Sequence, residues 1–127
     1  MIARRAIICA SAVAGLVAIM SPAPADAHAV LVKSVPAARV VLKRAPDRVQ
    51  LWFNERLEPA FSTASVWSAA GTRVDRQDAL VGPDDAKRLT ITLPGLEPGS
   101  YTVRFRVLSV DGHIVEASFL FTVKERP

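Results

Sequence analysis

The sequence has little sulfur and little histidine: one cysteine, two methionines and two histidines in 127 residues. Cys9, Met1 and Met20 all lie within residues 1–27. Residues 28–127 therefore contain no group that could form a disulfide, act as a thiolate nucleophile or bind a metal through sulfur. Aromatic residues are also few, at 6%.

Basic residues show no local concentration. The formal net charge is +4, and it falls to +3 for residues 28–127 because Arg4, Arg5 and Asp26 are the charged residues before them. Without a dense Lys/Arg cluster, nucleic acid is not an expected partner. A monomer with one modest core fits the one hundred residues that remain.

The first 27 residues are typical of a secretory signal peptide. Arg4 and Arg5 precede an apolar run over residues 6–20, which is short for a membrane span. The stretch Ala25-Asp26-Ala27 fits the small-x-small cleavage rule, so we expect a cut after Ala27. Residues 1–27 are then a leader, and residues 28–127 form one domain outside the cytoplasm. An uncleaved membrane anchor is the alternative.

The remaining sequence predicts an all-β fold. Tyr101–Val107 alternates apolar and polar residues, as a strand with one wet face does. Further β-rich runs separated by turn signals are Val49–Phe53, Ser65–Ser68, Leu89–Leu93 and Phe119–Val123. Short strands at this spacing favour a β-sandwich.

Smaller features add detail to this prediction. The segment Leu96–Tyr101 resembles a tyrosine corner, in which the tyrosine hydroxyl holds a loop between two sheets. Ala60–Ala64 has room for about one helical turn. We expect Trp52, Trp67 and the phenylalanines to belong to the core.

The two histidines suggest a metal site. After cleavage His28 becomes the first residue, and its α-amine and imidazole can bind one metal ion as a chelate. The second histidine lies in Asp111-Gly112-His113. If that segment is extended, the Asp111 and His113 side chains share one face. Two imidazoles, an amine and a carboxylate suit a tetragonal Cu(II) ion, whereas Cu(I) prefers sulfur ligands.

The mature sequence resembles the CopC family of periplasmic copper-resistance proteins along its whole length. The resemblance is carried by HAVLVKSVPA (28–37), VQLWFNERL (49–57), LEPGSYTV (96–103), VLSVDGH (107–113) and FLFTV (119–123). It implies a small Greek-key β-sandwich or barrel, immunoglobulin-like or cupredoxin-like, with about seven strands.

The resemblance also implies a function. It implies one Cu(II) bound by His28, Asp111 and His113, with Glu55 as a further ligand or near neighbour, in a non-enzymatic protein of copper homeostasis and resistance. It implies a CopD-like inner-membrane copper transporter as partner. Some relatives have a methionine-rich Cu(I) site, and residues 28–127 contain no methionine for one.

Three alternatives compete with this hypothesis. A metal-free immunoglobulin-like binding module explains the strands and leader, but not the pairing of His28 with Asp111 and His113. A lytic polysaccharide monooxygenase also uses an N-terminal histidine, but a carboxylate ligand would fill a position that oxygen activation needs. A serine hydrolase is disfavoured because no G-x-S-x-G motif is present.

Overall fold

The structure, a computed structural model, describes Gly15 and residues 30–125. Apart from Gly15, the predicted leader lies outside this part, and so does His28. The described elements are β1 (Leu31–Val35), β2 (Val41–Leu42), β3 (Arg48–Phe53), η1 (Pro59–Phe61), β4 (Thr63–Ser68), β5 (Leu80–Val81), β6 (Arg88–Thr92), β7 (Gly99–Leu108) and β8 (Ile114–Val123). None of the described helices is long and apolar enough to span a membrane.

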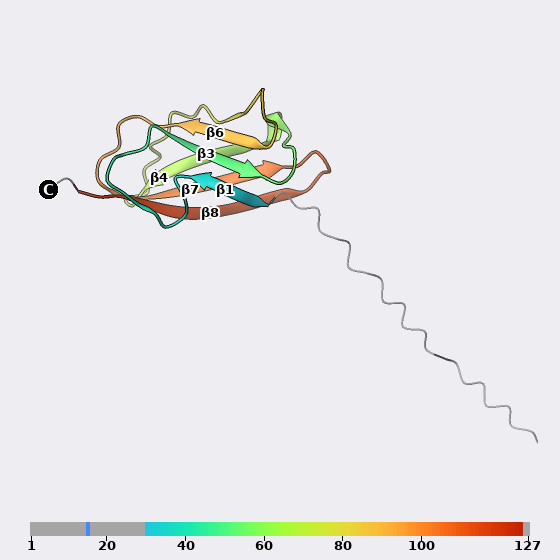
Figure 1. Cartoon of the computed structure of the whole chain (residues 1–127), viewed down its shortest axis with the longest axis horizontal. Helices are drawn as coiled ribbons and strands as arrows, with labels where there is room; N and C mark the ends of the chain where they lie inside the picture. Colours follow the sequence, from blue (N-terminus) through green and yellow to red (C-terminus); the bar gives the residue numbers. More distant parts are fainter. Residues whose placement is uncertain (1–14, 16–29, 126–127) are drawn as a thin grey trace, which may run out of the picture.

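The strands form two sheets that face each other, which confirms the predicted β-sandwich (Figure 1). One sheet has the order β1-β3-β6-β5, and the other has the order β2-β8-β7-β4. Most neighbours are antiparallel, but β2 runs parallel to β8. The eight described strands exceed the expected seven because two of them are only two residues long.

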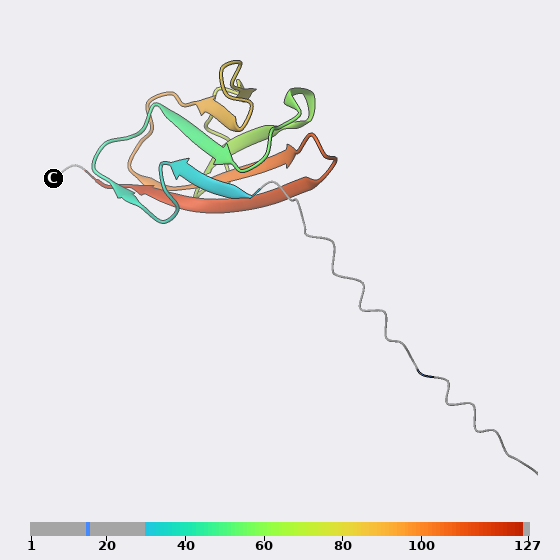
Figure 2. The same cartoon turned by 45° about the vertical axis from the view of Figure 1, so that its right-hand side comes forward.

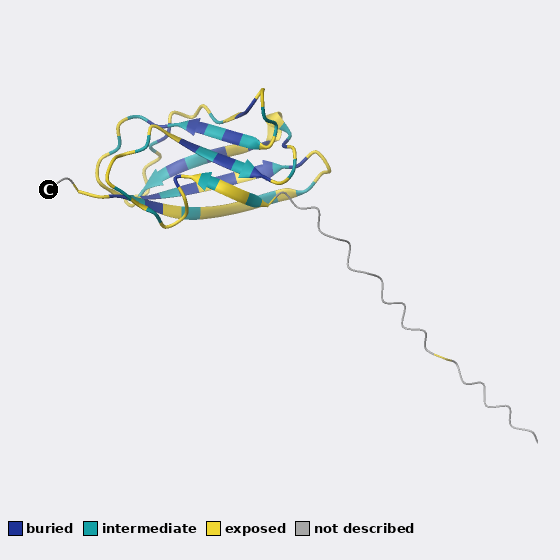
Figure 3. Ribbon diagram, in the orientation of Figure 1, coloured by how far each residue is buried: buried dark blue, intermediate teal, exposed yellow. Residues whose placement is uncertain are grey.

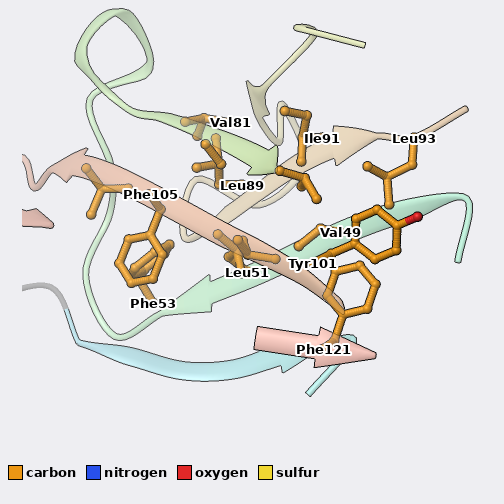
Figure 4. Packing of buried hydrophobic residues seen from close by; sticks show 14 of the residues in the cluster. Val49, Leu51, Phe53, Val81, Leu89, Ile91, Leu93, Tyr101, Phe105 and Phe121 are labelled. Atoms are coloured by element: carbon orange, nitrogen blue, oxygen red, sulfur yellow. The ribbon is translucent and has the colours of Figure 1, made fainter. Parts of the chain in front are cut away.

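The core fills the space between the two sheets. Along β7 the odd-numbered residues from Tyr101 to Val107 are buried, as their alternation predicts (Figure 3). Phe53 and Phe105 meet edge-to-face across the sandwich, with ring centroids 5.3 Å apart (Figure 4). This packing supplies a rigid support for the loops at each end of the sheets.

The tyrosine corner is present. The Tyr101 hydroxyl donates to the backbone carbonyl of Glu97, and the Tyr101 ring stacks on Phe121 with centroids 5.5 Å apart. The helical turn expected over Ala60–Ala64 is a 3-10 turn at Pro59–Phe61, slightly earlier in the chain.

The prediction that both tryptophans and all the phenylalanines belong to the core is wrong for several of them. Trp52 and Trp67 are half-buried on the outer faces of the sheets, because each occupies an outward position in its strand. Cations cover them: Lys33 Nζ lies 4.8 Å from the Trp52 ring centroid, and Arg104 Cζ lies 5.2 Å from that of Trp67. Phe61 is 63% exposed beside the 3-10 turn.

One end of the sandwich gathers the features that matter for the candidate site. The start of β1, the end of β3 and the loop between β7 and β8 all lie there, while the end of β8 lies at the other end (Figures 1 and 2). The antiparallel pairing of β1 with β3 brings Leu31 opposite Phe53. The first residues of the domain therefore lie beside the segment that follows β3.

Candidate metal centre

The loop between β7 and β8 is a tight turn over residues 109–113. The Ser109 amide donates to the His113 carbonyl at 2.9 Å, and the Gly112 amide donates to the Ser109 carbonyl at 2.9 Å. Gly112 has φ +91°, a conformation that glycine adopts without steric cost. The segment that holds Asp111 and His113 is thus a turn. It is not the extended segment that would have put both side chains on one face.

The turn nevertheless brings the two predicted ligands together. His113 Nδ1 lies 3.6 Å from Asp111 Oδ2, and the two side chains are 44% and 35% exposed. Both side chains are thus partly exposed, whereas the Nδ1 atom that faces Asp111 is itself buried. A carboxylate and an imidazole at this separation can bind the same metal ion.

Ser109 holds this pair in position. It is fully buried, and its hydroxyl donates to Asp111 Oδ1 and accepts from the His113 backbone amide at 3.3 Å. The hydrogen bond from Ser109 lowers the pKa of the Asp111 carboxyl, with a smaller contribution from His113. The carboxylate is therefore kept ionised, as a metal ligand must be.

The segment after β3 is tied to this turn. The Val110 amide donates to the Arg56 carbonyl at 3.0 Å, and Leu57 bridges to Ser109. Glu55, the fourth predicted ligand, is half-buried in this segment. Its backbone neighbours thus pack against the turn that holds Asp111.

The chain just after His28 is held at the same end. The Val30 amide donates to Asn54 Oδ1 at 2.6 Å, and the Asn54 amide donates to the Val30 carbonyl at 3.1 Å. We call this pair of hydrogen bonds the Val30–Asn54 clasp. It fixes the chain two residues after His28, next to Glu55.

Within residues 30–125, no group of three or more His, Cys, Asp and Glu side chains could hold a metal ion. The described chain thus brings together two of the predicted ligands, Asp111 and His113. His28 lies outside this part, and the roles of His28 and Glu55 remain predictions.

Sequence reasoning missed Ser109, which positions Asp111 and His113, and Asn54, which fixes Val30. Both are small polar residues at the end of a strand, where side chains that bond to nearby backbone are common. A serine two residues before an aspartate and four before a histidine was the available signal for Ser109.

Known proteins resemble this chain over nearly all of residues 30–125. The family model of the CopC domain matches residues 31–124. The crystal structure of CopC from Methylosinus trichosporium OB3b superposes with a TM-score of 0.73 at 40% identity, and the match covers 79% of this chain and 99% of that one. The chain therefore belongs to the CopC family.

Several curated relatives carry names that refer to copper. Copper resistance protein C of Pseudomonas syringae pv. tomato is 34% identical over 79% of this chain and 83% of that protein. Copper transport protein CutJ of Bacillus subtilis is 33% identical over 80% of this chain, but the match covers only 19% of that longer protein.

Proposed function

We propose that this protein is a periplasmic Cu(II)-binding protein of copper homeostasis and resistance. In this proposal the mature chain, cut after Ala27, is a monomer that binds one Cu(II). It buffers the ion or carries it to a membrane importer, and it catalyses no reaction.

The observation that carries the proposal is the pairing of Asp111 with His113 in the turn after β7. His113 Nδ1 and Asp111 Oδ2 are 3.6 Å apart, both side chains are partly exposed, and Ser109 holds the carboxylate. The Val30–Asn54 clasp holds the chain two residues after His28 at the same end of the sandwich. Three nitrogen donors and a carboxylate can thus converge there.

Each proposed ligand has its own role. His28 supplies its α-amine and imidazole, His113 a second imidazole, and Asp111 a carboxylate. Such a set of nitrogen and oxygen donors suits Cu(II), which also leads the divalent metals in affinity for these ligands. Glu55 is proposed as an axial ligand or as a charged neighbour of the ion.

The relatives support copper as the cargo. One is named for copper resistance and another for copper transport. The match to CutJ covers a small part of a much longer transport protein. A domain like this one therefore occurs within a copper transport protein, which supports a CopD-like membrane transporter as the partner of the free domain.

Titration of the purified mature protein with Cu(II), followed by its visible d–d absorption, tests the proposal. We expect saturation at one ion per chain. His113→Ala should weaken binding by more than about a hundredfold, because loss of a direct ligand exceeds the effect of losing an outer partner. Asp47→Asn, an exposed carboxylate next to Arg48, is the matched control and should bind as the parent does. An absent absorption band would refute the copper assignment.

A second titration tests the role of cleavage. A mature chain with one extra residue before His28 has an amide where the free amine would be, so it lacks one donor. We expect it to bind Cu(II) far more weakly than the chain that begins at His28. Equal affinity would show that the amine is not a ligand.

A further inference from the structure

Strand β8 has a free edge beside the candidate metal centre. Its other edge pairs with β7 along the whole strand, without a break in register. On the free side, β2 pairs only with Thr122 and Val123. Within residues 30–125, no strand pairs with this side between Ile114 and Ser118. We call this stretch the β8 edge.

The direction of the backbone groups on the β8 edge follows from the bonds nearby. The Leu120 carbonyl accepts from the Arg39 amide at 2.6 Å, and the Thr122 amide donates to the Val40 carbonyl at 2.9 Å. Backbone groups alternate sides along an antiparallel strand. The amides and carbonyls of Ile114, Glu116 and Ser118 therefore face the same side as those of Leu120 and Thr122, where they can pair with another strand.

An apolar groove runs along the β8 edge. Strand β1 lies beside β8 in both views of the fold, but it pairs only with β3 (Figures 1 and 2). The groove between them has a volume of about 570 Å³, and its apolar lining includes Val30, Leu31, Phe105, Val115, Ala117 and Phe119. Ala117 faces the core side of β8 and is still exposed, because β1 does not cover it. The sandwich is thus open along this line, and most of β8 is coloured as exposed in Figure 3.

From these observations we infer that the β8 edge binds an extended segment of a partner protein, which adds to the sheet as a further strand. Such a segment satisfies the free amides and carbonyls and places every second side chain in the groove. It therefore carries apolar residues at alternate positions. This inference rests on the proposed function for its biological meaning, since the partner is the protein that exchanges copper with this one.

The position of the edge favours a copper-exchanging partner. Ile114 directly follows His113, and Val30, at the other side of the groove, lies two residues after His28. Both residues are about half exposed. A strand bound here brings its own protein to the end of the sandwich at which Asp111 and His113 lie.

A second copy of this chain fits the edge less well. Two β8 edges paired antiparallel about their centre would put Glu116 opposite Glu116, and like charges directly opposite destabilise a strand pair. Each Glu116 binds Arg106 of its own β7 at 2.7 Å, which offsets only part of this repulsion because both side chains are more than half exposed. The β8 edge carries no basic residue that could compensate the second carboxylate.

Peptide selection tests the inference. The probe is a random-peptide library displayed on phage, selected on the mature protein, and the best binder is then synthesised with a fluorescent label. We expect it to carry apolar residues at alternate positions. Methylation of its alternate backbone amides, which removes the donors that face β8, should abolish binding.

Two variants of the protein locate the binding. Ser118→Pro removes an amide that faces the free side and leaves the pairing with β7 intact, as proline does at sheet edges. Ala117→Lys places a charge in the groove. Each should weaken peptide binding by about tenfold, which is the size expected when a hydrogen-bond partner is left unsatisfied or a charge is buried without a partner. Ser118→Ala and Ala70→Lys, which lies in an exposed turn, are the matched controls and should bind normally.

The outcomes separate this inference from the proposed function. Failure to select a peptide, or a peptide whose affinity is unchanged by Ala117→Lys, overturns the inference even if Ser118→Pro does not fold. Self-association in sedimentation that Ala117→Lys abolishes overturns it in favour of a second copy. Ala117→Lys should still take up one Cu(II). Absence of Cu(II) uptake by the parent protein would refute the proposed function and leave the peptide result standing.

Discussion

Removal of the Asp75 carboxylate is expected to destabilise the sandwich strongly. Asp75 lies in the loop that connects β4 to β5, and its side chain is fully buried. Its oxygens accept from the Val66 amide at 2.8 Å and the Gln77 amide at 2.8 Å. They also accept from Arg73, through Nε at 2.9 Å and a terminal guanidinium nitrogen at 3.1 Å. One carboxylate thus holds the segment after β4 against the sheet.

The structure sets the size of the effect for Asp75→Ala. Val66 is fully buried, so its amide would lose a bond to a charged group worth about 2 kcal/mol with no water to replace it. Gln77 is exposed and Arg73 is about a third exposed, so water replaces their bonds in part, and each contributes about 0.5 kcal/mol. The sum is about 3 kcal/mol, a large share of the 5–15 kcal/mol typical of a domain.

Thermal and urea unfolding followed by circular dichroism measure this loss. A cost of about 3 kcal/mol should lower the Tm by about 15 °C in a domain of this size. Asp47→Ala removes an exposed carboxylate bonded to Arg48 and is the matched control, with an expected change within about 0.5 kcal/mol. If Asp75→Ala were no less stable than Asp47→Ala, the hydrogen bonds of Asp75 would not hold this segment.

The same residue predicts a pH dependence. Burial raises the pKa of Asp75, but the hydrogen bonds from Arg73, Val66 and Gln77 outweigh burial and hold that pKa below its ordinary value of 3.8. A lowered pKa contributes stability that is fully present above pH 3.8 and is lost as the pH falls through the folded value. The stability difference between the parent and Asp75→Asn should therefore shrink at acidic pH. A constant difference down to complete protonation would contradict this assignment.

Three further predictions concern the site and its support. Asn54→Ala should weaken Cu(II) binding by about tenfold, as loss of an outer partner does, because it removes the side-chain acceptor for the Val30 amide. Asn54→Asp, which keeps the acceptor, should restore most of the affinity in the same titration. Equal affinities of Asn54→Ala and the parent protein would exclude a positioning role. Tyr101→Phe should cost about 1 kcal/mol in urea unfolding, because it removes the bond to the Glu97 carbonyl and keeps the ring; unchanged stability would contradict this. Cu(II) affinity should fall between about pH 8 and pH 5, because protons compete for the amine and imidazoles, and a flat profile in competition titrations would argue against nitrogen ligands.

The sequence predicted the strands whose side chains alternate cleanly. β3, β6 and β7 each have one buried face, so their period of two is visible in the residues. β1 was not predicted as a strand, because it lies at a sheet edge with an irregular register and exposes most of its side chains. β2 and β5 are too short for any periodicity to appear.

The geometry around Asp111 and His113 could not be predicted from the residue types alone. Asp111 and His113 share one place because a turn that depends on buried Ser109 brings them together, and spacing alone could not show that turn. The Val30–Asn54 clasp joins residues far apart in the chain, so it follows from the sheet register and not from any local motif. The tryptophans were misplaced because residue type was given more weight than alternation. Trp52 shares its face with Gln50 and Trp67 shares its face with Ser65, and a cation lies over each ring.

The Val30–Asn54 clasp has a consequence for how related chains can vary. Because it fixes Val30 against the end of β3, the chain before it can reach only about 3.5 Å further for each residue added. An insertion or deletion between residue 27 and β1 would therefore move the first residue relative to Asp111 and His113, even if every side chain were kept. The turns at the opposite end of the sandwich are under no such constraint. Between residue 27 and β1 we expect natural selection to preserve the number of residues more strictly than their identity.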